Sequence, residues 1–256
     1  MLNRSNAPAP DDFQARWKSD FEHRGNYFDD DASIAGWTTS GLITRFRSFR
    51  RLWAGARRNA LWVDIGCGAG TYTRFLAEEG LSVIGIDYSL PTLLKARARS
   101  ALGISWVTGD ATRLPIREGS IDGVLCFGLL QAVAATEPVL QAIARAMKPA
   151  GTLWIDALNA RCIPNSIGIH RRHLAGKPLH LRYETAETFR AALGESGFDA
   201  IMLHWIPILP PRLQWLQPLA ESRPVRWLLR RAPALAARVS HSMLVEARRR
   251  GSREHA

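Results

Sequence analysis

A glycine-rich turn between an apolar strand and a helix places the strongest constraint on the fold of this chain. Residues 61 to 73 read LWVDIGCGAGTYT, in which Gly66, Gly68 and Gly70 follow an apolar run and precede a helical pattern. A strand, turn and helix of this kind present backbone N–H groups to a ligand at the helix start. We therefore expect a nucleotide-like ligand to bind against this turn.

The spacing of the glycines narrows the choice of ligand. A phosphate-binding P-loop needs a lysine and then a serine or threonine after its last glycine, but Gly70 is followed by Thr71 and Tyr72. A dinucleotide fold needs its third glycine at position 71. The Asp64 carboxylate before the turn would also repel a pyrophosphate, whereas it suits a ligand that bears an ammonium or sulfonium group.

Strand-like and helical segments alternate from residue 60 onward. Further apolar runs read LSVIGID, ISWVTGD, IDGVLCFG and GTLWIDAL, and residues 72–79, 90–101 and 138–147 have helical patterns. This alternation predicts a parallel sheet covered by helices on both faces. Ligands of such sheets bind beyond the carboxyl ends of the strands. Here these ends carry Asp64 to Gly70, Asp87, Asp110 and Phe127.

The segments at the two ends of the chain differ from this core. Residues 1–58 are predicted to form an N-terminal helical cap, because the pattern from Asp11 onward is helical and rich in aromatic residues. The first ten residues and residues 250–256 are expected to be disordered.

The main domain, residues 59–250, contains two segments that interrupt the alternation. Residues 160–182 are irregular and contain three histidines, and a loop of this length in a compact domain is usually functional, so we expect a substrate loop there. Residues 210–239 are helical and divided by prolines. They form a predicted insertion between a strand at 198–209 and a last strand at 241–248.

Five stretches of the chain, taken in order, resemble the motifs of class I S-adenosylmethionine-dependent methyltransferases. They read VDIGCGAGTYT, VIGIDYS, VTGDATRLPI, IDGVLCFGLLQAV and AMKPAGTLWID, and the resemblance is strong over residues 60–158. The pattern is most similar to the methyltransferase type 11 group, which includes ubiquinone and menaquinone biosynthesis methyltransferases. The resemblance implies a Rossmann-like, doubly wound sheet of seven mostly parallel strands in the order 3-2-1-4-5-7-6, with the last strand antiparallel. It also implies S-adenosyl-L-methionine as the cofactor.

The resemblance assigns cofactor-binding roles to particular residues. Gly66 and Gly68 lie beside the methionine part of the cofactor, where side chains would block its approach. Asp87 accepts hydrogen bonds from the ribose hydroxyls, and Asp110 with the Ala111 backbone reads the adenine amino group. Taken alone, either carboxylate would also fit a turn or a helix cap. The full predicted set is Asp64, Gly66, Gly68, Gly70, Asp87, Tyr88, Asp110, Ala111 and Phe127.

The identity of the methyl acceptor is less constrained. The fourth strand ends in CFGLLQ and lacks the Asn or Asp, paired prolines and aromatic of DNA base methylases, so a DNA partner is disfavoured. Only Asp156 and Asn159 could contribute oxygen ligands after the fifth strand, so no metal is predicted. The resemblance favours O-methylation of a small-molecule, sugar or lipid-linked acceptor.

A general base for the acceptor would come from the histidines of the 160–182 loop. Imidazole titrates near neutral pH, which makes His170, His173 and His180 the candidates. Each of them also fits a surface histidine in a basic loop.

The net charge of +11 suits an anionic partner. In the insertion, RPVRWLLRRAPAL puts Val225, Leu228 and Leu229 on one helical face with arginines around it. Together with Trp215 and Trp227, this pattern suits an anionic membrane surface or a lipid-like acceptor, and it also suits a helical lid. An RNA-modifying methyltransferase or an RNA-binding protein is the alternative, although the chain shows no separate RNA-binding module.

Cysteine usage and hydropathy bear on location. Cys67, Cys126 and Cys162 have no metal-site spacing, and no run is long and apolar enough to span a bilayer. We expect a cytoplasmic protein that contacts the inner face of the membrane at most peripherally.

Overall fold

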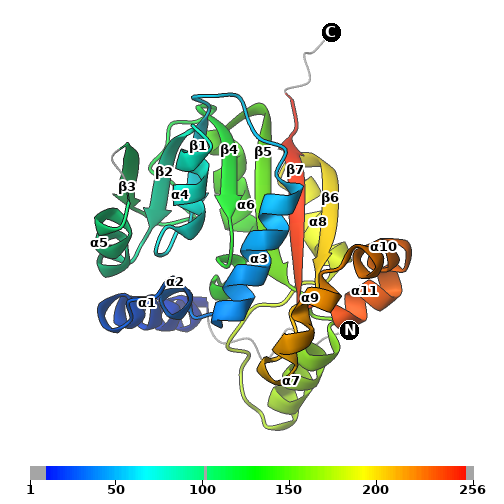
Figure 1. The fold of residues 1–256 in the computed structure, drawn as a ribbon. Helices are drawn as coiled ribbons and strands as arrows, with labels where there is room; N and C mark the ends of the chain where they lie inside the picture. Colours follow the sequence, from blue (N-terminus) through cyan, green and yellow to red (C-terminus); the bar gives the residue numbers. More distant parts are fainter. Residues whose placement is uncertain (1–9, 101–102, 252–256) are drawn as a thin grey trace.

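The computed structural model describes residues 10–100 and 103–251 (Figure 1). Disorder was expected at residues 1–10 and 250–256, of which residues 1–9 and 252–256 fall outside the described residues. The expectation is wrong at Pro10, which begins a helix, and at Arg250, whose N–H donates to the Gly197 carbonyl at 2.9 Å. Within the described part, no helix is long and apolar enough to cross a membrane.

A mostly parallel sheet forms the centre of the molecule. Among the described residues it has seven strands in the order β3-β2-β1-β4-β5-β7-β6. The strands are β1 (Leu61–Ile65), β2 (Ser82–Asp87), β3 (Ile104–Thr108), β4 (Ile121–Cys126), β5 (Met147–Leu158), β6 (Phe198–Ile206) and β7 (Ser242–Arg249). The pairs from β3 to β5 are parallel, and β7 is antiparallel to both β5 and β6. The predicted order and the antiparallel last strand are confirmed.

The register places β1 at the switch point of the sheet. Asp64 of β1 pairs with Gly85 of β2 on one side and with Leu125 of β4 on the other. From β1 the strand order proceeds through β2 and β3 on one side and through β4 and β5 on the other, and this reversal opens a crevice at the carboxyl ends of the strands.

Helices cover both faces of the sheet. One hydrophobic cluster joins α6 (Thr136–Ala146) and α8 (Ala186–Glu195) to the strands. The other joins α3 (Thr39–Leu52) and α4 (Thr71–Glu78) to the opposite face. The remaining helix on the sheet, α5 (Leu90–Ala98), packs against α1 (Pro10–Tyr27).

The first two helices of the cap and the insertion lie toward the carboxyl ends of the parallel strands, and α3 runs across one face of the sheet (Figure 1). The cap consists of α1, α2 (Asp31–Ala35) and α3. The insertion between β6 and β7 consists of η3 (Pro211–Leu216), α9 (Gln217–Ala220), α10 (Arg223–Arg231) and α11 (Pro233–Val239). Pro218, Pro224 and Pro233 each lie in the first turn of a helix, where a missing N–H costs no hydrogen bond. These prolines start the helices of the insertion.

The predicted irregular loop at 160–182 is wrong over half its length. Residues 163–174 form the helix α7 (Ile163–Leu174). Pro164 lies in its first turn, so the proline that suggested irregular structure marks the helix start. The strand β5 also begins earlier than predicted, at Met147. Its pairing with β4 is irregular between Ile121 and Gly123, and beyond this irregularity Ile121 still pairs with Met147.

The cluster between α3 and the sheet depends on one aromatic side chain. Phe49 is fully buried and packs edge-on against Phe75, Phe127 and Trp154, with ring centroids 5.2 to 5.6 Å apart. We expect Phe49→Ala to lower the free energy of unfolding by about 3–5 kcal/mol, because a cavity remains in a packed core. Urea denaturation measures this change. Ile43→Ala, at an exposed position of the same helix, should cost less than about 0.5 kcal/mol, and an equal loss in both variants would contradict the assignment.

Candidate cofactor-binding site

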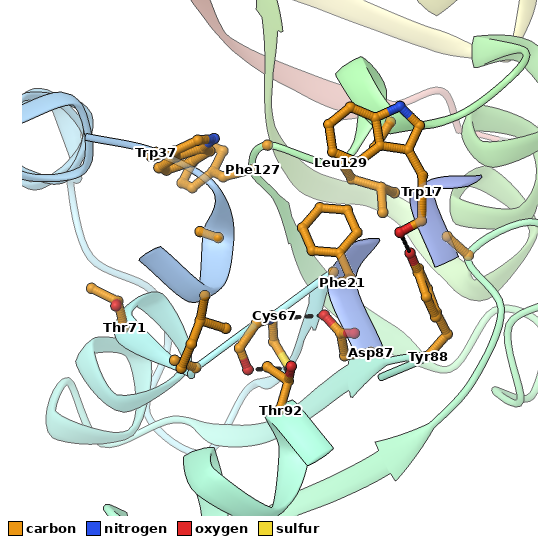
Figure 2. Close-up of a pocket in the computed structure, with 18 of the residues that line it drawn as sticks. Trp17, Phe21, Trp37, Cys67, Thr71, Asp87, Tyr88, Thr92, Phe127 and Leu129 are labelled. Atoms are coloured by element: carbon orange, nitrogen blue, oxygen red, sulfur yellow. Dashed lines mark hydrogen bonds between the residues drawn. The ribbon is translucent and has the colours of Figure 1, made fainter. Parts of the chain in front are cut away.

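A cavity of about 220 Å³ lies at the carboxyl end of the sheet. Its walls come from the glycine turn after β1, the ends of β2, β3 and β4, and the cap helices α1 and α2 (Figure 2). Seven of the predicted cofactor residues line it: Gly66, Gly68, Asp87, Tyr88, Asp110, Ala111 and Phe127.

The glycine turn requires backbone conformations that disfavour side chains. Gly66 and Gly68 have φ of 69° and 51°, in the left-handed region. The N–H groups of Gly66 and Cys67 both donate to the Ile86 carbonyl, at 2.8 and 3.1 Å. A Cβ on Gly66 would lie 2.9 Å from Leu129 Cδ1, whereas a Cβ on Gly68 would meet no atom within 4 Å. Gly66 is therefore favoured by its left-handed φ and by the close Leu129 side chain, and Gly68 leaves open space facing the cavity.

Asp87 joins the glycine turn to the end of β2. Its Oδ2 accepts a hydrogen bond from the Gly68 N–H and its Oδ1 accepts one from the Ser89 N–H, both at 2.9 Å. Burial raises the pKa of Asp87, and the two amide hydrogen bonds partly oppose this rise. The carboxylate is thus fixed at the cavity wall (Figure 2), where it can accept hydrogen bonds from ligand hydroxyls.

Asp110 and Phe127 form the neighbouring walls. Asp110 Oδ1 accepts hydrogen bonds from the Thr112 N–H and hydroxyl, at 2.7 and 2.8 Å, and this turn presents Ala111 to the cavity. Phe127 packs against Tyr72 with ring centroids 4.6 Å apart. The walls of the cavity are therefore a mixture of fixed polar groups and packed aromatic rings.

Two predicted residues, Asp64 and Gly70, do not line the cavity. Asp64 is 2% exposed, and its Oδ2 accepts a hydrogen bond from the Thr73 hydroxyl at 2.6 Å. This hydrogen bond ties β1 to α4 and directs the carboxylate to Thr73. Gly70 is the N-cap residue of α4. A Cβ at this position would lie 2.6 Å from Trp106 Cη2, so the glycine allows the helix to start close to this ring.

The three candidate histidines also lie outside the cavity lining. His170 and His173 are exposed on α7, and His180 is exposed after it. The His180 backbone carbonyl accepts a hydrogen bond from Trp17 Nε1 at 3.1 Å, so this residue contacts the cap through its main chain. The structure therefore does not bring the three imidazoles together at the cavity.

The cap supplies cavity residues that the sequence patterns did not identify: Trp17, Lys18, Phe21, Asp31, Ile34, Ala35 and Trp37. The Tyr88 hydroxyl donates to the Trp17 carbonyl at 2.9 Å, and Phe21 meets the Tyr88 ring edge-on at 6.1 Å (Figure 2). The aromatic composition of residues 11–58 predicted a cap, but it could not indicate which rings face the site.

A buried polar cluster lies next to the cavity, behind Phe127. Arg45 Nε is 3.3 Å from Asp156 Oδ2, and Asp156 Oδ1 accepts from the Gly128 N–H at 2.6 Å. The Tyr72 side chain, which also lines the cavity, places its hydroxyl near this ion pair without a hydrogen-bond partner among the described residues. The cluster thus holds the end of β4 in place and leaves one unpaired hydroxyl beside the site.

Comparisons with known proteins agree with this geometry. Residues 63–155 match the family described as methyltransferase domain. The ubiquinone biosynthesis O-methyltransferase of Cupriavidus pinatubonensis is 35% identical over 101 residues, which are 38% of this chain and 41% of that protein. The demethylmenaquinone methyltransferase of Corynebacterium kroppenstedtii is 31% identical over 137 residues, covering 53% of this chain and 58% of that protein.

A solved structure shares the fold at low identity. Phosphoethanolamine N-methyltransferase 2 of Haemonchus contortus, in complex with S-adenosyl-L-methionine, superimposes with a TM-score of 0.62 at 18% identity. The match covers 96% of this chain and 61% of that one. The chain spans less than two thirds of the length of each of these three proteins.

The sheet order and the glycine turn give this chain the fold of the class I S-adenosylmethionine-dependent methyltransferases. Residues 63–155 belong to the methyltransferase domain family, and the resemblance inferred from the motifs is confirmed.

The buried Asp64 predicts a pH dependence of stability. Burial raises the pKa of Asp64 to about 7, from an ordinary value of 3.8. Because the folded state binds this proton more tightly than the unfolded chain, the contribution of Asp64 is complete below about pH 4 and is lost as the pH rises through about 7. Asp64→Asn keeps an acceptor for Thr73 without titrating. The stability of this variant relative to the wild type should therefore rise by a few kcal/mol over that range, at about 1.4 kcal/mol per pKa unit.

Urea unfolding of both proteins at several pH values between about 4 and 8 measures this difference. A difference in unfolding free energy that stays constant over the range would show that Asp64 has an ordinary pKa in the folded protein.

Proposed function

We propose that this protein is an S-adenosylmethionine-dependent methyltransferase that acts on a small-molecule, sugar or lipid-linked acceptor, with oxygen as the methylated atom. The observation that carries the proposal is the Asp87 carboxylate, which is held against the Gly68 amide in a cavity at the switch point of the sheet. The named activities of the relatives, ubiquinone biosynthesis O-methylation and demethylmenaquinone methylation, support the same class of reaction.

The residues of the cavity fit this cofactor. The open space at Gly68 admits the methionine part, Asp87 can accept hydrogen bonds from the ribose hydroxyls, and Asp110 with Ala111 can hold the adenine. When bound, the cofactor supplies an electrophilic methyl group. The work of this chain is then to align the acceptor and to exclude water.

The cap helices exclude water from the cavity. Trp17, Phe21 and Trp37 come from the cap and cover the cavity with apolar rings. On the far side, Phe127 and Gly128 lie between the cavity and the Arg45–Asp156 pair.

Among these acceptor classes, the arginine-rich insertion supports a lipid-linked acceptor that is met at the inner face of an anionic membrane. The net charge of +11 also supports a second candidate, an RNA-modifying methyltransferase, whose affinity for RNA would fall steeply with salt.

Asp87→Ala tests the cofactor assignment. We expect the dissociation constant for S-adenosylmethionine, measured by titration calorimetry, to rise at least about tenfold, because a hydrogen bond to a charged group contributes about 1.5–3 kcal/mol. Asp87→Asn should show an intermediate loss, since it keeps one acceptor for the backbone amides.

Asp199→Ala is the matched control, because Asp199 is an exposed carboxylate on β6 outside the cavity. The affinity of the Asp199→Ala variant for S-adenosylmethionine should equal that of the wild type. Unchanged affinity in a folded Asp87→Ala protein would refute the site.

A further inference from the structure

The exposed hydrophobic side chains of this protein are concentrated in two segments. Among the described residues, ten of the sixteen exposed large hydrophobic side chains belong to α7 or to the insertion. They are Ile163, Ile167, Leu174, Leu213, Trp215, Leu219, Trp227, Leu228, Leu235 and Val239. Exposed hydrophobic side chains that concentrate in this way are typical of binding surfaces.

The helix α7 has an apolar stripe that no other described element covers. Ile163, Ile167 and Leu174 are spaced by four and seven residues, so they lie on one face of the helix. Among the residues of this helix, only the polar Asn165 is buried. The helix therefore attaches to the domain through a polar residue and directs its hydrophobic residues to solvent.

Hydrogen bonds attach α7 to the end of the insertion. Asn165 Nδ2 donates to the carbonyls of Asn159 and His241, at 2.8 and 3.3 Å. Asn159 Nδ2 in turn donates to the carbonyls of Ala237 and Ser240, both at 2.7 Å. The first turn of α7 is thus held beside the end of α11, and both segments lie toward the same end of the sheet (Figure 1).

The charge of both segments is strongly positive. Residues 160–182 contain five basic residues and no acidic residue, and residues 207–239 contain six arginines and one glutamate. That glutamate, Glu221, forms ion pairs with Arg47 and Arg51 of α3, at 2.7 and 3.8 Å. Within the described residues, no ion pair involves the arginines of α10 or α11. In residues 160–182, Arg161 and Arg182 pair with Glu187 and Glu184, so the charge available to an external anionic partner comes mainly from α7, α10 and α11.

The chain after α7 leads directly to the cavity. The Arg182 N–H donates to the Gln131 carbonyl at 2.9 Å, and the next residues, Ala132 and Val133, line the cavity. A partner bound on α7 would therefore lie close to the rim of the cofactor site.

We propose that residues 163–174 and 211–239 form one docking face that binds the surface of an anionic phospholipid bilayer, with α7 and α10–α11 lying in the interfacial plane. The inference rests on the proposed function in one respect, because a lipid-linked acceptor requires the cavity to lie at the membrane. Arginines bind the headgroups, while isoleucine, leucine and tryptophan side chains enter the region between headgroups and acyl chains. An RNA partner would not explain the aliphatic stripe of α7, since RNA-binding surfaces use stacking aromatic rings and cationic side chains.

Vesicle co-sedimentation of the full chain tests the docking face. We expect binding to vesicles that contain phosphatidylglycerol, weaker binding as salt is added, and at least about tenfold weaker binding to pure phosphatidylcholine vesicles. Absence of binding to phosphatidylglycerol vesicles at low salt would overturn the proposal.

Two sets of variants separate the apolar and charged contributions. Ile163→Ser/Ile167→Ser/Leu174→Ser should weaken binding at least about tenfold through lost apolar burial. Arg230→Glu/Arg231→Glu should also weaken it at least about tenfold, since each arginine near an anionic surface strengthens binding about fivefold.

Matched controls lie elsewhere on the protein. Leu94→Ser/Met202→Ser removes two exposed hydrophobic side chains from α5 and β6. Arg57→Glu/Arg58→Glu reverses two exposed arginines before β1, at the amino end of the sheet. Both controls should bind vesicles like the wild type, and an equal loss in the controls would show non-specific adsorption and overturn the proposal.

Two further measurements complete the test. Light scattering that shows a dimer disrupted by the α7 variant, or tRNA binding lost in the Arg230→Glu/Arg231→Glu variant without vesicle binding, would assign the face to another partner. Calorimetry with S-adenosylmethionine should give the same affinity for all four variants. Vesicle binding without cofactor binding would refute the proposed function and leave the docking face intact, and the reverse result would refute the docking face alone.

Discussion

The hydrogen bond from the Gly68 amide to the Asp87 carboxylate connects the parts on which the site depends. It links the turn after β1 to the end of β2, and the same carboxylate accepts from Ser89 at the start of α5. The geometry requires left-handed backbone at Gly66 and Gly68, so that the amides of the turn can face Ile86 and Asp87. Burial of a carboxylate raises the free energy of the folded state unless the carboxylate is hydrogen-bonded. Here the Gly68 and Ser89 amides supply those hydrogen bonds, and one side of the carboxylate faces the cavity.

The rest of the molecule is built around this crevice. The sheet supplies the switch point at β1, and the aromatic cluster around Phe49 fixes α3 against its face. The cap then closes over the cavity through Trp17 and Phe21, with Tyr88 donating to the Trp17 main chain. On the other side, the ion pair of Arg45 with Asp156 holds the end of β4. The cofactor site and the proposed docking face have different structural requirements. The site needs rigid buried contacts, whereas the docking face needs a helix surface that the rest of the protein leaves uncovered.

Most of the sheet could be predicted from the sequence, because parallel strands buried on both faces are continuous apolar runs. One proline was a source of error. Pro164 resembles a break in a pattern, yet in the first turn of α7 it costs no hydrogen bond. Asp64 illustrates a different limit, because its place in the motif does not show whether the carboxylate points to the cavity or to Thr73. Two opposite orientations are compatible with the same local sequence.

The sequence by itself determined the glycine turn and the position of Asp87, since both follow from local spacing and from the polarity of a few neighbouring residues, whereas the strand order followed from the resemblance of the motifs to a known family. Only the tertiary structure decided which cap residues reach the cavity, because Trp17 meets Tyr88 across 71 residues of chain and His180 across 163. It also decided that α7 leaves its hydrophobic stripe uncovered. An amphipathic pattern predicts that a helix has an apolar face. Whether that face packs on the core or faces solvent depends on long-range contacts, which a local pattern does not predict.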